Sequence, residues 1–172
     1  GKTTTLRLVA GFASPTSGTI RIAGRDITNT PPHKRDVGMV FQNYALFPHM
    51  SIRDNIAYPL RMRRVPKAER RRMVDEALDM VRMTGLGDRR PRELSGGQQQ
   101  LVGIARALIA KPKLLLADEP TGNLNSKQGE EIMELFKELN NDGVAIIQVT
   151  HSEKNAAYGS RIINLLDGRI EH

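Results

Sequence analysis

The sequence predicts an α/β fold in which a mostly parallel sheet is flanked by helices. Three short apolar runs support this prediction, because each has the length of a buried strand and polar residues follow it: 36–41, 113–117 and 144–150. Longer segments with helical periodicity separate these runs, as crossovers between parallel strands require. Ligands bind beyond the carboxyl ends of strands in such sheets, so the residues after each run are the first candidates for a site.

The chain opens on the final part of a phosphate-binding loop. The pattern G-x-x-x-x-G-K-[ST] ends in the chain's first residues, Gly1, Lys2, Thr3 and Thr4, and an apolar-periodic helix follows. In such loops the lysine, here Lys2, reaches the β- and γ-phosphates, and the hydroxyl of Thr3 binds Mg²⁺. We therefore expect a P-loop NTPase fold whose loop is incomplete at its N-terminal side. We expect the strand that delivers this loop to lie beside the 113–118 strand.

The stretch LSGGQ, residues 94–98, precedes a second apolar-periodic helix. Ser95 and Gln98 have the spacing of a helix capping box, which is the purely structural interpretation. Gly96 and Gly97 weaken a helix start, but they present bare backbone N–H groups, as phosphate binding at a helix N-terminus requires. We favour phosphate binding.

Polar residues with catalytic chemistry follow each of the three predicted strands. Asp118 and Glu119 suit two roles, one holding Mg²⁺ and the other orienting or deprotonating an attacking water; the alternative is a solvated turn. Gln42 follows the first strand, and its amide can bind Mg²⁺ and water, although taken alone it is better read as opening a surface loop. His151 follows the third strand, where its imidazole can bind the γ-phosphate and the attacking water.

These motifs together resemble the nucleotide-binding subunit of an ABC transporter over nearly the whole chain, and LSGGQ is specific to that class of P-loop ATPases. The resemblance implies that Gly1, Lys2, Thr3, Thr4, Gln42, Ser95, Gly96, Gly97 and Gln98 bind ATP. It implies that Thr3, Gln42 and Asp118 hold Mg²⁺, and that Glu119 and His151 act in catalysis. Residues 32–60 resemble importers of polyamines, iron or sugars, whereas residues 118–170 resemble lipoprotein-release and macrolide-export ATPases.

The same resemblance implies the partners and the domain organisation. Residues 1–172 are expected to form one nucleotide-binding domain, N-terminally incomplete, with a helical lobe inserted at 43–92 that contacts transmembrane permease subunits. Two copies are expected to pair head to tail around two ATP molecules, at the cytoplasmic face of the inner membrane as a peripheral subunit. Asn125 stands where the family usually has Asp. Asparagine lacks the negative charge of aspartate at the interface between the two copies, but it keeps an acceptor oxygen.

The remaining elements follow from periodicity and turn residues. Helices are expected at about 50–60 and 67–83 within the lobe, and at 126–139 after the acids. Residues 17–26 and 161–170 have the pattern of short hairpins.

Composition narrows the possible functions. The 172 residues contain 26 Lys and Arg against 19 Asp and Glu, a net charge of +7. Much of the excess lies within 61–72, where a solvated helix face is the favoured reading, and without zinc spacing or RNA-type aromatics no nucleic-acid partner is expected. No cysteine is present, and no apolar run approaches the ~20 residues of a membrane span.

Two other functions stay open at this point. One is a non-transport ABC ATPase that works on DNA or ribosomes, and the other is a module that holds ATP without hydrolysing it. Residues 1–172 alone are expected to bind ATP weakly and to be inactive, because the rest of the backbone N–H cradle is missing from the loop. Substrate and direction of transport are not predicted.

Overall fold

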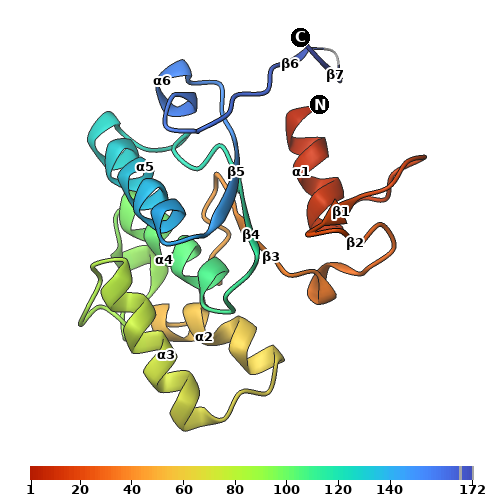
Figure 1. The fold of residues 1–172 in the computed structure, drawn as a ribbon. Helices are drawn as coiled ribbons and strands as arrows, with labels where there is room; N and C mark the ends of the chain where they lie inside the picture. The colour runs from red at the N-terminus through yellow and green to blue at the C-terminus, as the bar shows by residue number, and fades with distance from the viewer. Residues whose placement is uncertain (167, 172) are drawn as a thin grey trace.

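The computed structural model describes residues 1–166 and 168–171, and a three-stranded parallel sheet forms its centre (Figure 1). The strands are β3 (Val37–Val40), β4 (Leu114–Asp118) and β5 (Ala145–Val149), in the order β3-β4-β5. Each lies within one of the three predicted runs or one residue from its end, so the predicted α/β class with a mostly parallel sheet is confirmed.

Helices cover both faces of this sheet. Helix α1 (Lys2–Ala10) packs on one face, and α4 (Gly96–Leu108) and α5 (Ser126–Asn141) pack on the other (Figure 1). Successive strand residues point to opposite faces, so Leu115 joins the core on the α4–α5 side and Leu116 joins the core under α1. Both are 0% exposed, which places β4 at the centre of the fold.

Two expectations about the sheet are wrong. Both edges of β4 are hydrogen-bonded, since Leu114 pairs with Val37 on one side and with Ala145 on the other, so no further strand can lie beside it. Strand β5 is also less buried than expected for an inner strand, because Ile147 is 46% exposed. Ile147 points to the same face as Val149, which packs against the α1 core, but the cover of α1 does not extend to it.

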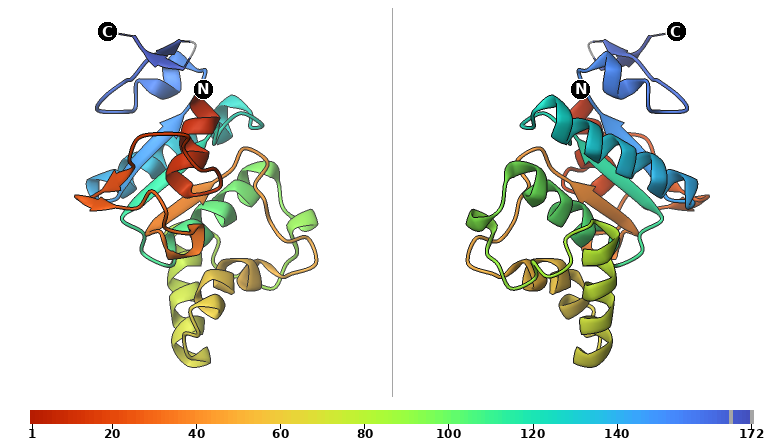
Figure 2. Two further views of the ribbon diagram at one scale, coloured as in Figure 1. Left: turned by 90° about the vertical axis from the view of Figure 1, so that its right-hand side faces the viewer. Right: turned by 90° about the vertical axis from the view of Figure 1, so that its left-hand side faces the viewer.

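The α2–α3 segment lies at one end of the sheet and packs against α4. It contains α2 (Ile52–Met62) and α3 (Lys67–Met80), which extend away from the strands in Figure 2. Ser51 caps α2 as predicted, because its hydroxyl accepts the N–H of Asp54. The bounds of 43–92 for an inserted lobe stay a proposal.

Short elements complete the chain, and both predicted hairpins occur as pairs shorter than expected. Antiparallel strands pair in two places, and Asp167 of the second predicted hairpin lies outside the described residues. The short elements are β1 (Arg21–Ile22), β2 (Arg25–Asp26), η1 (Pro32–Lys34), η2 (Pro91–Glu93), α6 (Glu153–Ala156), β6 (Leu165–Leu166) and β7 (Arg169–Ile170).

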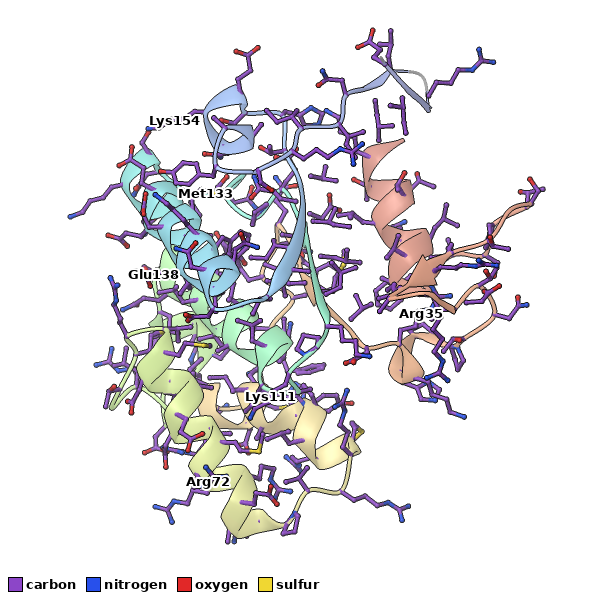
Figure 3. All side chains as sticks on the ribbon, viewed as in Figure 1. Arg35, Arg72, Lys111, Met133, Glu138 and Lys154 are labelled. Carbon is purple, nitrogen blue, oxygen red and sulfur yellow. The ribbon has the colours of Figure 1, made fainter. Side chains whose placement is uncertain are left out.

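The C-terminal end of α1 is fixed by a buried arginine, labelled in Figure 3. The guanidinium of Arg35 donates to the carbonyl oxygens of Leu8 and Val9 in α1, and to those of Thr28 and Thr30 in the loop before η1. Helix carbonyls at a C-terminus lack partners within the helix and favour a cation. Arg35 therefore holds in place the helix whose other end carries the phosphate-loop residues. Among the described residues, no helix is both long and apolar enough to cross a membrane.

Candidate functional site

Residues from three distant parts of the chain meet where α1 begins. Lys2 Nζ lies 3.5 Å from His151 Nδ1, and Thr3 Oγ1 donates to Asp118 Oδ1 at 3.1 Å. Gly1 precedes the helix, and its carbonyl oxygen accepts the N–H of Thr5. Helix α1 packs along the face of the sheet and begins at the carboxyl ends of β4 and β5. The phosphate-loop residues and the residues after these strands therefore face one another, as expected for ligand binding in an open α/β sheet.

Glu119 is held in an unusual backbone conformation. Its φ angle is +46°, in the left-handed region that non-glycine residues rarely adopt, and its N–H donates to the carbonyl oxygen of Val149 at 2.9 Å. Such strain costs on the order of 1–3 kcal/mol and persists where surrounding structure enforces it, as at active sites. Glu119 is the catalytic candidate that the sequence placed here.

The carboxylate of Glu119 has an open acceptor. Its side chain is 19% exposed, and Oε1 is buried without an aligned hydrogen bond, although His151 Nε2 lies 3.4 Å away. When Nδ1 of a neutral His151 accepts from Lys2, Nε2 carries the hydrogen and faces Glu119. A buried carboxylate oxygen that lacks a donor suits a water molecule that must be oriented and deprotonated.

An open pocket of about 570 Å³ lies in front of these side chains. The phosphate-loop residues form one wall, and the C-terminal hairpin forms another. Its lining residues are Gly1, Lys2, Thr3, His151, Leu165 and Gly168. Sequence reasoning placed the first four at a site but missed the hairpin, because Leu165 and Gly168 carry no signal for phosphate chemistry. Thr4 follows on α1 and is exposed.

Gln42 is fixed by an amide pair that the sequence did not predict. Its Nε2 donates to Asn123 Oδ1 at 3.3 Å, and Asn123 Nδ2 donates back to the carbonyl oxygen of Gln42 at 3.1 Å. This pairing uses the nitrogen of the Gln42 side chain, so the amide oxygen is the atom for a cation or water. A methyl group at Gly122 would lie 2.6 Å from Gln42 Nε2, so a larger residue there would displace the Gln42 side chain from its pairing with Asn123.

The LSGGQ residues form a complete capping box at the start of α4. Ser95 Oγ accepts the N–H of Gln98 at 3.3 Å, and Gln98 Oε1 accepts the N–H of Ser95 at 3.0 Å. These bonds occupy neither the Gly96 nor the Gly97 N–H group, so the cap and phosphate binding are compatible. In the described residues these four do not line the pocket at Lys2, so they would bind a phosphate elsewhere.

The oxygen donors near Thr3 fit Mg²⁺. Thr3 Oγ1 and Asp118 Oδ1 lie within 3.1 Å of each other, and Mg²⁺ prefers oxygen ligands from one or two protein groups, with phosphates and waters completing the shell. Over residues 1–166 and 168–171, no cluster of three or more His, Cys, Asp or Glu side chains could hold a metal by itself. A site shared with a nucleotide phosphate is therefore the kind that these residues support.

Comparison with known proteins identifies the family that has this arrangement. The model of the family described as "ABC transporter" matches residues 1–122. The chain belongs to the ABC transporter family. The dimeric ATP-binding cassette MJ0796 bound to ADP and Pi has the same fold, with a TM-score of 0.87 and 37% identity, covering 100% of this chain and 79% of that one. This agreement confirms the ABC cassette fold.

Curated relatives of this ABC protein carry importer names. The spermidine/putrescine import ATP-binding protein PotA of Acidothermus cellulolyticus is 49% identical over 99% of this chain and 45% of its own length. The Fe(3+) ions import ATP-binding protein FbpC of Photobacterium profundum is 48% identical over 99% of this chain and 49% of its own length. The chain thus spans about half the length of the curated relatives it matches.

Proposed function

We propose that this chain is the ATP-hydrolysing part of an ABC importer. The observation that carries the proposal is an open pocket lined by Lys2, Thr3 and His151, with Asp118 in contact with Thr3 and Glu119 in contact with His151. Phosphoryl transfer needs a positioned γ-phosphate, neutralised charge and a water in line with the bond that breaks. Each of these requirements has a residue that lines this pocket or contacts one that does.

The chemistry is divided among the residues of the site. Lys2 binds the γ-phosphate as a cation, and His151, which lies between Lys2 and Glu119, supports the γ-phosphate and the attacking water. Thr3, Asp118 and the amide oxygen of Gln42 would hold Mg²⁺. When bound, Mg²⁺ neutralises the charge on the β- and γ-phosphates. Glu119 orients the attacking water and takes its proton at the open Oε1.

A second copy of the chain completes the unit. Ser95, Gly96, Gly97 and Gln98 do not line the pocket at Lys2, so we propose that they bind the ATP of the other copy in a head-to-tail dimer. The dimeric state of the MJ0796 cassette supports this arrangement. Hydrolysis would then separate the copies, and the α2–α3 segment would pass the movement to permease subunits at the cytoplasmic face of the membrane.

The names of the relatives support a direction of transport and a class of cargo. Both names state import, of spermidine and putrescine in one case and of Fe³⁺ in the other. We therefore propose import of a cationic solute. A non-transport ABC ATPase acting on DNA is the second candidate, because seven basic residues gather on the α2–α3 segment: Arg61, Arg63, Arg64, Lys67, Arg70, Arg71 and Arg72.

The test uses the full-length protein with its permease in lipid vesicles. ATP hydrolysis is measured with spermidine, with Fe³⁺ and with duplex DNA, beside a Lys2→Met variant. The proposal predicts hydrolysis that one of the two cations stimulates and that Lys2→Met abolishes. Stimulation by DNA alone would support the second candidate. Hydrolysis that is equal in wild type and Lys2→Met would contradict the assignment of the site.

A further inference from the structure

A buried glutamine on α4 contacts the loop that carries the catalytic glutamate. Gln100 is 0% exposed, and its Nε2 donates to the carbonyl oxygen of Pro120 at 2.6 Å. Pro120 directly follows Glu119, so the bond fixes the Pro120–Thr121 peptide group, one residue beyond the strained Glu119. Within the described residues, the buried side-chain atoms that lack a hydrogen-bond partner are Gln100 Oε1 and Glu119 Oε1.

The position of Gln100 on α4 connects two parts of the site. It lies five residues after Ser95, on the same rigid helix that begins with the LSGGQ residues. Further along α4, the guanidinium of Arg106 donates to the carbonyl oxygens of Ala45 and Tyr44, in the loop that follows Gln42. Helix α4 is therefore bonded to the loop of the metal-binding glutamine and to the loop of the catalytic glutamate.

These hydrogen bonds can transmit a small movement of α4 to the loops that it contacts. A helix moves as one body, and hydrogen bonds to buried carbonyls resist stretching because an unpaired buried group costs free energy. A shift of α4 at its N-terminus would reach Pro120 through Gln100. The backbone of Glu119 is strained, so the position of its carboxylate depends on what holds the residue that follows it, Pro120.

We propose that Gln100 is a positioning residue that couples the LSGGQ residues to Glu119 of the same chain. The inference rests on the proposed head-to-tail dimer, in which these residues contact the ATP held by the other copy. Binding of ATP at one site would then set Glu119 at the other site. The two sites would then hydrolyse ATP cooperatively, and the cooperativity would depend on the hydrogen bond between Gln100 and Pro120.

The main variant is Gln100→Met, which keeps the size of the side chain and removes the donor. In the full-length protein, the rate of ATP hydrolysis is measured against ATP concentration. We expect kcat to fall about tenfold, because misplacement of a catalytic group by a fraction of an ångström has effects of that order. We expect KM to stay within about twofold, since Gln100 does not touch the nucleotide pocket. The Hill coefficient should fall from above 1 to about 1.

Two further variants separate positioning from folding. Asn55→Leu removes an equally buried amide in α2, far along the chain from Glu119, and should lower the melting temperature while leaving the Hill coefficient unchanged. Gln100→Glu keeps the shape but donates only when its carboxyl group is protonated. Its kcat relative to that of wild type should rise as pH falls, which a purely structural role would not produce.

The outcomes separate the inference from the proposed function. If wild type hydrolyses ATP but Gln100→Met keeps its kcat and Hill coefficient, the coupling role is wrong and the motor assignment stands. The same holds if wild type is not cooperative, or if both Gln100 variants lose activity only in step with stability. If the full-length wild type does not hydrolyse ATP at all, the proposed function fails, and the coupling role fails with it.

Discussion

The α2–α3 segment and the carboxyl edge of the sheet differ in whether their buried polar side chains have hydrogen-bond partners. In α2, Asn55 is 0% exposed and uses both ends of its amide: Oδ1 accepts the N–H of Phe47, and Nδ2 donates to the carbonyl oxygens of Phe47 and Ser51. Glu119 at the sheet edge and Gln100, which contacts this edge from α4, each have an acceptor oxygen without a hydrogen-bond partner among the described residues, and the backbone of Glu119 is strained as well.

This difference indicates a structural role for the α2–α3 segment and a role in hydrolysis for the sheet edge. A fully bonded buried amide adds specificity and stability to the packing around it. Open acceptors and strained backbone cost free energy, and they persist where a ligand or a reaction needs them. We therefore expect substitutions in the α2–α3 segment to change stability and substitutions at the edge to change hydrolysis. The following predictions test that separation.

The largest effect on stability is expected at Asn55. Asn55→Leu leaves the N–H of Phe47 and the carbonyl of Ser51 without their side-chain partner in a buried region. The free energy of unfolding should fall by about 2 kcal/mol, which is the usual cost of burying unpaired polar groups. Urea denaturation measures it, and kcat for ATP should be unchanged. A large loss of kcat at temperatures where the variant is folded would contradict the expectation that this segment affects stability and not hydrolysis.

A substitution at Gly122 is expected to lower the rate of ATP hydrolysis more than the stability. In Gly122→Ala the new methyl group would lie 2.6 Å from Gln42 Nε2, so the Gln42–Asn123 pair must shift. We predict a decrease of about tenfold in kcat with a raised requirement for Mg²⁺, because Gln42 is a proposed metal ligand. Hydrolysis assayed over a range of Mg²⁺ concentrations measures both. Gly143→Ala is a control in a turn remote from the site, where a methyl group meets no atom within 4 Å but the φ of +96° is strained. It should lower stability and leave the Mg²⁺ dependence alone.

A smaller effect on stability is expected at Asn125. Its Oδ1 accepts the N–H of Gln128 at 2.9 Å and caps α5. Asn125→Ala should lower the free energy of unfolding by about 1 kcal/mol, the usual cost of losing such a cap. Asn125→Asp keeps the acceptor and adds a charge that a helix N-terminus favours, so it should be equal to wild type or more stable. Thermal unfolding of both variants tests this, and a more stable Asn125→Ala would contradict it.

The smallest effect is expected from an exposed ion pair between α5 and α6. The hydrogen bond and charge of Lys154, which is labelled in Figure 3, lower the pKa of Glu130. The same contact with Glu130 raises the pKa of Lys154. A lowered carboxyl pKa gives stability that is lost as pH falls through it, and a raised lysine pKa gives stability that is lost as pH rises through it. The pair should therefore contribute between these two pKa values and only slightly, because both groups are exposed.

Glu130→Gln isolates this contribution. Its melting temperature should differ most from that of wild type near neutral pH and converge with it in acid. High salt should remove the difference, because solvent-exposed charges are screened. A difference that grows as pH falls below the range in which Glu130 titrates would contradict the assignment.

The elements with strong local signals were predictable from the sequence. The apolar runs of β3 and β4 and the cap at Ser51 were predicted because periodicity and capping chemistry act between near neighbours. The phosphate-loop motif lies within a few consecutive residues, so Lys2 and Thr3 were also predicted at the site from the motif alone.

Contacts between distant residues were not predictable. The order of strands carries no local signal, so the expected neighbour of β4 was wrong. The bonds from Asn123 to Gln42 and from Gln100 to Pro120 join residues 81 and 20 positions apart through single amide groups, which leave no periodic trace. The capping box at Ser95 and phosphate binding at Gly96 share one sequence pattern, so spacing alone does not separate them.

The central claim is that the sheet edge is organised for ATP hydrolysis around Glu119. The most direct measurement compares ATP hydrolysis by the full-length protein with that of a Glu119→Gln variant, which keeps the shape and removes the base. The account predicts that kcat falls at least about 100-fold, in the range for loss of a general base, while an ATP-bound dimer accumulates and the melting temperature does not drop. A variant that hydrolyses ATP at the wild-type rate would contradict it.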